Sequence, residues 1–290
     1  DVPASGQLPR LLSDFKPHFD REAYCEIVEK TKGYIREGDI FQAVPSNRLT
    51  AEMEGSLFNT YRVLRTINPS PYMYYIACDD LEIAGASPET LVKLQDGELS
   101  TFPIAGTSPS SRTSEEDDEL EERLLKDPKE LAEHNMLVDL GRNDLGRVSR
   151  YGSVKVQEYL KVQKYSHVMH ITSVVTGQLR ESMDQLDAVA AVLPAGTLSG
   201  APKIRACEII NELEGIRRGI YGGAIGYIDF TGNMDVCIAI RTAVKKDGRV
   251  YVQSGGGVVA DSDPEKEYQE SINKAMAVVE AVKQSVEVMD

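Results

Sequence analysis

The spacing of hydrophobic and polar positions along the chain predicts both helices and strands. Apolar residues recur every three or four positions over residues 20–37 and 57–67, which is typical of helices with one buried face. Gly38 ends the first of these helices, and the Asn-Pro-Ser-Pro sequence at 68–71 ends the second. Two further helices are predicted to begin at Asp127 and Asp263.

Shorter apolar or alternating runs between the helices predict strands. They cover residues 40–47, 72–78, 81–84, 91–94, 99–104, 154–159, 167–176, 224–229, 234–244 and 250–253. The run 72–78 is continuously apolar, which predicts burial on both faces. Thr-Gly-Asn at 231–233 predicts a hairpin turn, with Arg241 in the second strand of that hairpin. Strands grouped by hairpins, without regular β-α-β alternation, predict an α+β fold with largely antiparallel sheets.

The helices that begin at Asp127 and Asp263 share one pattern of acidic residues. Each starts with Asp-Pro, an N-cap acceptor followed by proline at the first helical position. Each then carries two glutamates at i, i+3 spacing, which places both on one face. The pairs are Glu130 with Glu133, and Glu267 with Glu270. A single pair is more typical of a solvated acidic face, but two matching pairs favour a shared Mg²⁺, which takes one or two carboxylates plus water and an anionic substrate.

Composition indicates a soluble intracellular protein. The chain has 290 residues, 41% of them hydrophobic, which is enough for one large domain or two modest ones. Its net charge of −14 argues against a nucleic-acid-binding surface. Four scattered cysteines without a Cys-x-x-Cys spacing predict reduced, mostly buried thiols in the cytoplasm. There is no apolar run long enough for a membrane span and no signal peptide. We expect residues 1–18 to form a linker or entry arm and residues 19–290 to form one catalytic domain.

Several polar residues are candidates for chemistry, each with a plainer alternative. Gln42 lies among apolar neighbours. Its side chain is either a core amide with satisfied hydrogen bonds or part of a site. The Gly-Ala-Ser-Pro turn before Glu89 is either ordinary turn chemistry or the support of an acid. His167 and His170 fall on opposite faces of a regular strand, so only one of them can point into a given site.

Two glycine-rich segments are candidates for binding an anion. Residues 194–203, Pro-Ala-Gly-Thr-Leu-Ser-Gly-Ala-Pro-Lys, lead directly into a helix whose first amides suit an oxyanion, although most such turns are only caps. Residues 254–257, Ser-Gly-Gly-Gly, let a ligand approach bare backbone. Together with Arg241 and the acidic pairs, these segments predict an enzyme that acts on a small carboxylated substrate with magnesium.

Seven motifs in order resemble one family over nearly the whole chain. They are DIFQ (39–42), NPSPYM (68–73), SPE (87–89), PIAGT (103–107), EHNMLVDLGRNDLGR (133–147), PAGTLSGAPK (194–203) and SGGGVVAD (254–261). They resemble the chorismate-utilising enzymes, and among these the large subunits of anthranilate synthases. The resemblance implies two large, mostly antiparallel sheets packed face to face, with helices outside and the active site between the sheets. It implies that Glu133 and Glu270 contact Mg²⁺, with Glu130 and Glu267 supporting them.

The resemblance also implies roles for the other candidates. Glu89 matches the general acid that protonates the departing C4 hydroxyl of chorismate, and His170, rather than His167, matches the histidine that assists loss of pyruvate. Thr197 and Gln42 complete the catalytic group. The residues implied to bind substrate are Gly106, Thr107, Lys203, Tyr221, Arg241, Gly255, Gly256 and Gly257.

Two positions distinguish reactions within the family. Water-adding relatives carry a lysine base where this chain has Gln42, and aminodeoxychorismate synthases typically carry a lysine nucleophile where it has Ala105. The reaction left is attack of ammonia at C2 and elimination of pyruvate to give anthranilate, the first step of tryptophan biosynthesis. A glutamine amidotransferase subunit would supply the ammonia. The alternatives are an aminodeoxychorismate synthase component I, or a truncated fragment that binds chorismate or tryptophan without catalysis.

The chain departs from the family in two places. The loop after PIAGT is usually Arg-Pro-Arg-Gly, but here it is Ser108-Pro109-Ser110-Ser111, which removes two cations beside an anionic site. Family members are also far longer at the N-terminus, which implies that this chain is a fragment or processed piece. The absent part would carry half of a feedback site for tryptophan. Residues Asn68, Pro69, Ser70, Pro71, Tyr72 and Met73 would form the other half.

Overall fold

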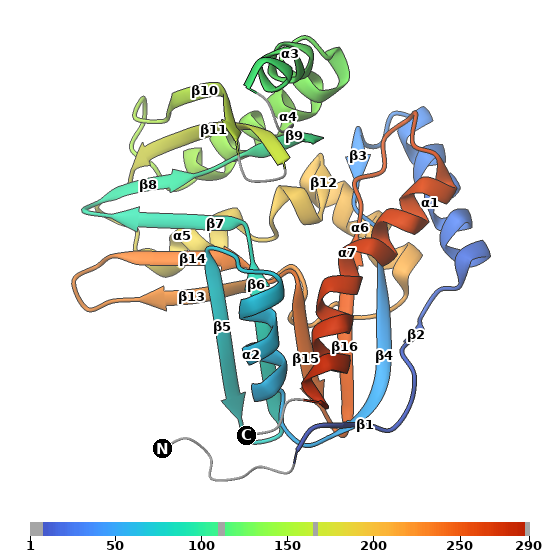
Figure 1. Cartoon of the computed structure of the whole chain (residues 1–290). Coiled ribbons are helices and arrows are strands. Elements are labelled where there is room, and N and C mark those ends of the chain that lie inside the picture. The colour runs from blue at the N-terminus through green and yellow to red at the C-terminus, as the bar shows by residue number, and fades with distance from the viewer. Residues whose placement is uncertain (1–7, 110–113, 165–167, 288–290) are drawn as a thin grey trace. The chain divides into compact units, whose positions relative to one another are not determined.

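The chain divides into two compact units, each built from segments far apart in the sequence. The computed structural model describes residues 8–109, 114–164 and 168–287 (Figure 1). The first unit draws on residues 1–89, 197–223 and 238–290, and the second on residues 90–196 and 224–237. The sequence-based boundaries, an arm over 1–18 and one domain over 19–290, stay a prediction.

The first unit is organised around a seven-stranded antiparallel sheet. Its strand order is β1-β4-β16-β15-β6-β5, with β2 also paired to β4. The strands are β1 (Arg10–Leu11), β2 (Lys16–Pro17), β4 (Ser46–Glu54), β5 (Tyr72–Cys78), β6 (Leu81–Ser87), β15 (Thr242–Lys246) and β16 (Arg249–Gly255). The predicted entry arm is thus attached to the sheet by its two short strands. A separate two-stranded sheet pairs β3 (Gln42–Ala43) with β12 (Gly200–Ala201).

The described part of the first unit contains four α-helices. They are α1 (Arg21–Arg36), α2 (Phe58–Ile67), α6 (Lys203–Glu214) and α7 (Pro264–Ser285). Figure 1 shows α2 and α7 side by side against the sheet. Between them lies a core in which Leu64 of α2 and Val278 of α7 are fully buried with Met53, Ala84 and Val250 of the strands. Burial of these apolar side chains is the main favourable contribution to the folding of this unit.

The second unit has a sheet of its own. Its strand order is β10-β11-β8-β7-β14-β13, with β9 also paired to β11. The strands are β7 (Thr90–Gln95), β8 (Glu98–Thr101), β9 (Ile104–Pro109), β10 (Lys155–Lys164), β11 (Val168–Gln178), β13 (Ala224–Ile228) and β14 (Met234–Ile238). The helices are α3 (Ser114–Leu124), α4 (Pro128–Gly146) and α5 (Gln185–Val192). The prediction of large antiparallel sheets is confirmed.

The predicted starts of α4 and α7 are confirmed in detail. The side chain of Asp127 accepts hydrogen bonds from the N–H groups of Lys129 and Glu130. The side chain of Asp263 accepts one from the N–H of Lys266 at the start of α7. In both helices proline occupies the first turn, where its missing N–H costs nothing.

Four strand predictions are wrong. The predicted strand 40–47 is divided between β3 and β4, which belong to different sheets, and the predicted strand 99–104 is divided between β8 and β9. The run 72–78 forms β5, which pairs with β6 at the end of the described sheet and leaves Ile76 37% exposed, instead of being buried on both faces. The predicted strand 234–244 is broken into β14 and β15, and Arg241 lies between them rather than within a strand. A run of apolar residues cannot distinguish an edge strand from a central one, nor reveal that the chain passes from one sheet to another.

The four cysteines are all free thiols, as predicted. The prediction that most are buried is wrong, because only Cys237 is buried, Cys25 and Cys207 are partly buried, and Cys78 on the edge strand β5 is exposed. In the parts of the chain that the structure describes, no helix combines the length and the apolar character that a membrane span requires.

Candidate functional site

Three motifs noted in the sequence meet at strand β3. On one side, Phe41 N–H donates to Ala201 O over 2.7 Å and Val44 N–H donates to Ser199 O over 2.9 Å. On the other side, Val258 N–H donates to Ala43 O over 2.8 Å. The Gln42 strand therefore lies between the PAGTLSGAPK segment and the SGGGVVAD segment.

The side-chain amide of Gln42 is buried and incompletely satisfied. The residue is 4% exposed, and its Oε1 has no hydrogen-bond partner in the described part of the chain. A Cβ added to Gly257 would lie 2.3 Å from Gln42 Nε2, so the amide contacts bare backbone there. Leaving a buried acceptor unpaired costs about 1–3 kcal/mol, a cost that a ligand with a suitable donor would remove. Of the two interpretations of Gln42, a satisfied core amide does not fit this geometry.

Glu89 lies two residues after the end of β6 and has a hydroxyl partner. Thr197 Oγ1 donates to Glu89 Oε1 over 2.8 Å, which joins the SPE and PAGTLSG motifs. Loss of solvent around the carboxyl raises the pKa of Glu89, although the Thr197 hydrogen bond and the charges of Lys274 and Arg241 oppose the change. A raised pKa favours the protonated carboxylic acid, which can donate a proton.

Arg241 occupies the connection between β14 and β15. Its φ of 49° lies in the left-handed region, which non-glycine residues seldom adopt. The N–H of Ala86 donates to Arg241 O over 3.1 Å, so this backbone is held against β6 close to Glu89. Unusual backbone held in this way is frequent at binding sites.

Tyr221 lies beside the same connection. The N–H of Gly222 donates to Ala239 O over 2.9 Å, and the N–H of Ala239 donates to Gly223 O over 2.8 Å. Loss of solvent raises the pKa of Tyr221, so its phenol remains a protonated donor at neutral pH. Tyr221 can therefore donate a hydrogen bond to a carboxylate.

The acidic pair of α7 converges on the glycines that follow β16. A Cβ added to Gly256 would lie 2.8 Å from Glu267 Oε2 and 3.8 Å from Glu270 Oε1. Glu270 is half exposed and forms an ion pair of 2.6 Å with Lys274. Lys274 Nζ also donates to Gly255 O over 3.3 Å. Sequence reasoning missed Lys274, although its i, i+4 spacing from Glu270 was the available signal.

In the second unit, α4 carries the other acidic pair. Glu130 and Glu133 are both partly buried. The neighbouring His134 is fully buried, and its Nε2 lies 2.6 Å from Ser173 Oγ of β11. Burial lowers the pKa of His134 to about 4, so its ring is neutral at physiological pH. This hydrogen bond joins α4 to β11 and thereby holds the backbone of Glu133.

His170 lies on β11, where its Cα partner on β9 is Thr107. His170 is partly buried, and Gly106 and Thr107 both belong to β9. The second unit thus brings the predicted histidine next to the PIAGT backbone. His167, Ser110 and Ser111 lie outside the described residues.

Of the predicted residues, Asn68 to Pro71 connect α2 to β5, and Tyr72 and Met73 are the first two residues of β5. Asn68 is the C-cap of α2, and its Nδ2 is buried without a hydrogen-bond partner among the described residues. Met73 packs against the core of the first unit. A donor without a partner at this connection is a feature that a ligand with an acceptor could satisfy.

The donors in the acidic pairs fit magnesium. No group of three or more His, Cys, Asp or Glu side chains in the described chain is close enough to hold a metal by itself. Each pair offers two carboxylates, and the missing side chain of Gly256 lets the carboxylates of the α7 pair approach bare backbone. Magnesium requires only one or two protein carboxylates when water and an anionic substrate supply the rest.

Comparison with protein families identifies the chain. Residues 3–280 match the family described as chorismate binding enzymes. The chain belongs to this family. The chorismate binding enzymes include the proteins that the seven motifs resembled, so that resemblance is confirmed.

The similar curated members of the family are anthranilate synthase component 1 proteins. The chain is 56% identical to that of Acetivibrio thermocellus over 271 residues, 93% of this chain and 55% of the relative. It is 55% identical to that of Pseudomonas aeruginosa over 276 residues, 94% of this chain and 56% of the relative. The chain therefore spans about 55% of the length of the curated relatives it matches.

Solved structures agree with this assignment. Anthranilate synthase component I from Streptococcus pneumoniae superposes with a TM-score of 0.85 at 51% identity, over 93% of this chain and 60% of that one. MenF, the menaquinone-specific isochorismate synthase of Escherichia coli, superposes with a TM-score of 0.84 at 23% identity, over 97% of this chain and 65% of that one. The second similarity shows the shared fold of the chorismate binding enzymes.

Proposed function

We propose that this chain is the chorismate-converting part of an anthranilate synthase component 1, a lyase. It would convert chorismate and ammonia to anthranilate and pyruvate, the first step of tryptophan biosynthesis. The proposal is supported by identities of about 55% to proteins of that name. A partner amidotransferase would release the ammonia from glutamine, and the free thiols of the chain fit a reducing cytoplasm.

Gln42 is the observation that favours ammonia over water as nucleophile. A neutral amide can orient ammonia, but it cannot deprotonate water. Its buried Oε1, which has no partner in the described part of the chain, is an acceptor for one N–H of the incoming ammonia. Ammonia needs no base to attack C2 of chorismate, provided that it stays unprotonated.

Glu89 would act as the general acid in the first half of the reaction. As the C2–N bond forms, the C4–O bond breaks, and the carboxyl of Glu89 gives its proton to the departing hydroxyl, which leaves as water. The raised pKa of Glu89 supports this role because it keeps the proton available near neutral pH. Thr197 would orient the carboxyl through its hydrogen bond.

His170 would act in the second half of the reaction. Removal of the proton at C2 and cleavage of the bond to the enolpyruvyl oxygen release pyruvate and leave the aromatic ring of anthranilate. Arg241, Tyr221, Lys203, Thr107, Gly106 and the amides of Gly255 to Gly257 would hold the carboxylates of the substrate. A positive side chain and phenol or amide donors suit carboxylates.

Glu133 and Glu270 would hold Mg²⁺, with Glu130 and Glu267 beside them. When bound, the ion would supply positive charge that offsets the negative charge of a substrate carboxylate. Lys274, which forms an ion pair with Glu270, would become available to the substrate once the ion takes that carboxylate. Residues Asn68 to Met73 would form half of a tryptophan feedback site.

One assay tests the proposed reaction. The chain would be incubated with chorismate, ammonium and magnesium, and anthranilate would be followed by its fluorescence. It would be tested alone and joined to the N-terminal segment of a full-length relative, with Glu89→Gln as the inactive control in each form. We expect anthranilate from at least one form and none from Glu89→Gln.

The outcomes separate the proposal from its rivals. Activity in the joined form alone would mean that the chain carries the site but needs the further segment. Chromatography that reveals aminodeoxychorismate instead of anthranilate would favour the aminodeoxychorismate synthase alternative. If neither form consumes chorismate, the proposed function is wrong, which would favour the alternative of a non-catalytic fragment.

A further inference from the structure

A buried ion pair lies at the end of α6, outside the groups that would react. Gly215, with a φ of 61°, ends α6 after Glu214, and the chain then returns so that Arg218 faces that glutamate. Arg218 Nε donates to Glu214 Oε2 over 2.9 Å, and Arg218 Nη2 donates to Glu214 Oε1 over 2.5 Å. The side chain of Glu214 is 1% exposed and that of Arg218 is 19% exposed.

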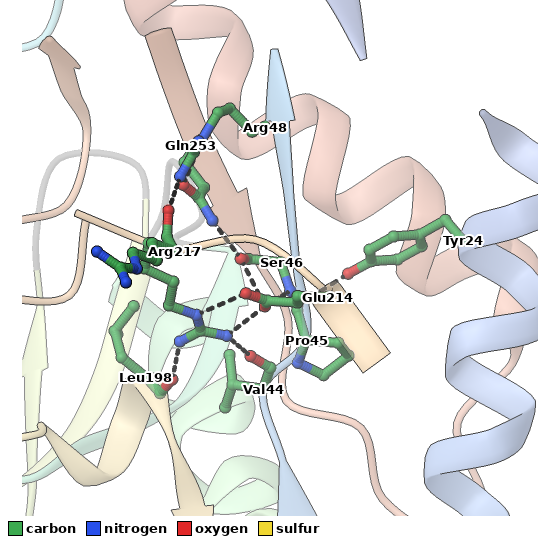
Figure 2. Close-up of polar contacts among 10 residues, drawn as sticks. Tyr24, Val44, Pro45, Ser46, Arg48, Leu198, Glu214, Arg217 and Gln253 are labelled. Atoms are coloured by element: carbon green, nitrogen blue, oxygen red, sulfur yellow. Dashed lines mark hydrogen bonds and ion pairs between the residues drawn. The ribbon is translucent and has the colours of Figure 1, made fainter. Parts of the chain in front are cut away.

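Arg218 also holds two distant backbone carbonyls. Its Nη1 donates to Leu198 O and its Nη2 donates to Val44 O, each over 2.6 Å. The guanidinium lies over the ring of Tyr221, 5.4 Å from the ring centre. Figure 2 shows Val44, Leu198 and Glu214 converging from separate segments of the chain.

Glu214 extends this network to the start of β4. Its Oε1 accepts hydrogen bonds from both the N–H and the Oγ of Ser46, each over 2.7 Å. Gln253 Nε2 donates to Ser46 Oγ over 2.7 Å, and Tyr24 OH donates to Pro45 O over 3.0 Å (Figure 2). The short segment 44–46 is therefore held by hydrogen bonds to both its backbone and its side chains.

The anchored points adjoin the candidate catalytic residues. Leu198 directly follows Thr197, which donates to Glu89. Val44 lies two residues after Gln42. We propose that Arg218, held by Glu214, is a positioning residue that sets Thr197, Gln42 and Tyr221 relative to one another. This inference rests on the proposed conversion of chorismate, and Arg218 itself would touch no reacting atom.

The geometry requires arginine rather than any cation. One flat guanidinium donates four hydrogen bonds to four acceptor atoms on three residues, and the same group lies over an aromatic ring. A lysine ammonium has three donors and no plane, so it can neutralise Glu214 but cannot hold both carbonyls and the ring. The single substitution Arg218→Lys therefore separates the effect of the positive charge from the effect of positioning.

A purely structural role makes a different prediction. Buried ion pairs are weak evidence for stability, because apolar replacements are frequently as stable. A structural role would lower the folded fraction without changing the kinetics of each folded molecule. A positioning role would change the kinetic constants for chorismate and the pH dependence set by Glu89.

The test compares Arg218→Lys with Arg217→Lys in whichever form of the protein makes anthranilate. Arg217 is exposed, and its backbone carbonyl accepts a hydrogen bond from Arg48, whose Nε donates to Gln253 Oε1 over 3.0 Å. The substitution to lysine leaves that carbonyl in place. We expect Arg218→Lys to lower kcat/KM for chorismate about 10–100-fold per folded molecule, because small misplacements of reacting groups have effects of this size. We expect Arg217→Lys to have the same kcat/KM for chorismate as the unmodified protein.

The pH profile provides a second readout. The hydrogen bond from Thr197 lowers the pKa of Glu89, so loosening Thr197 should move the alkaline limb of kcat to higher pH. Thr197→Val should move the limb in the same direction. The double variant Thr197→Val with Arg218→Lys should move it little further, because both changes act on one interaction.

Folding is checked by circular dichroism and thermal unfolding. If Arg218→Lys does not fold, the double variant Glu214→Gln with Arg218→Gln removes both charges and leaves no unpaired buried ion, and the same kinetics apply to it. Folded Arg218 variants with the kinetics and pH profile of Arg217→Lys would overturn the positioning role. Absence of anthranilate from the unmodified protein would instead contradict the proposed function, and this inference with it.

Discussion

Single residues of this chain owe their reactivity to the groups that surround them. Glu89 is an ordinary glutamate by sequence, yet loss of solvent raises its pKa while Thr197 donates to it. Gln42 is an ordinary amide, yet its buried oxygen has no partner in the described part of the chain. A substrate could use the raised pKa of Glu89, and a nucleophile could use the unpaired oxygen of Gln42.

Removing the hydroxyl of Thr197 tests the role of Glu89. Thr197→Val deletes the hydrogen bond that lowers the pKa of Glu89, so that pKa should rise further. If the protonated form is the catalyst, activity is lost as the pH rises through this pKa, and the alkaline limb of kcat should move to higher pH. Thr197→Ser, which keeps a hydroxyl, should behave like the unmodified protein. A limb that stays in place would show that Glu89 does not supply the proton.

Replacing Gln42 with lysine tests the choice of nucleophile. Gln42→Lys removes an amide that can orient ammonia and introduces a base that can activate water if burial keeps it neutral. We expect anthranilate formation to fall about 10²-fold and a hydroxylated product to appear on chromatography. Phe41→Lys is the matched control, since Phe41 is 73% exposed. Anthranilate made at the original rate by Gln42→Lys would place Gln42 away from the nucleophile.

Helices depend on partners supplied by other elements as well as on their own caps. α4 and α7 have aspartate caps that the sequence displays directly. At the start of α2, by contrast, the N-cap is Leu57, whose side chain makes no cap hydrogen bond. Glu82 of β6 accepts the N–H of Leu57 over 2.8 Å instead, together with hydroxyl donors from Ser56 and Tyr75.

Glu82→Gln should therefore destabilise the protein in a pH-dependent way. Burial raises the pKa of Glu82, but its hydrogen bonds and Lys245 outweigh burial and lower that pKa below its ordinary value. A lowered pKa contributes stability that is present above the ordinary pKa of about 4.5 and is lost as the pH falls through the folded value.

Urea unfolding measures this effect. We expect Glu82→Gln to reduce the free energy of unfolding by about 1–3 kcal/mol at pH 7 and by less at acidic pH. The control is Glu54→Gln, because Glu54 is exposed on β4 of the same sheet. An equal loss at pH 7 and at acidic pH would show that the charge of Glu82 is unimportant.

At the scale of the whole molecule, the candidate residues are divided between two units. The first unit contains Gln42, Glu89, Arg241 and the acidic pair of α7, and the second contains His170 and the acidic pair of α4. Each unit has its own antiparallel sheet. The proposed reaction therefore needs residues from both units.

Magnesium binding tests the contribution of α7. Magnesium should raise the melting temperature of the unmodified protein. Glu270→Gln removes a proposed ligand, so it should abolish that rise and most of the turnover. Glu280→Gln is the control, since Glu280 lies on the same helix and pairs only with Lys283 among the interactions described. Without magnesium the melting temperature should change little, because the exposed pair of Glu270 with Lys274 contributes at most about 1 kcal/mol. Equal stabilisation of Glu270→Gln by magnesium would rule out Glu270 as a ligand.

The sequence by itself determined the features that depend on neighbouring residues. The starts of α4 and α7, the spacing of both acidic pairs and the antiparallel character of the sheets all follow from caps, periodicity and turns. These signals act over a few residues, so they are present in the sequence whatever the rest of the chain does. The seven motifs also indicated the family of the chain, and the family match over residues 3–280 confirms it.

Only the tertiary structure decided which distant groups meet. Thr197 and Glu89 are 108 positions apart, and Arg218 holds the carbonyl of Val44, which is 174 positions away. The break at Arg241 and the exposure of β5 likewise depend on which strands pair. Local propensity carries no information about such pairs, because their free energy comes from desolvation and hydrogen bonding between segments that are brought together only by folding.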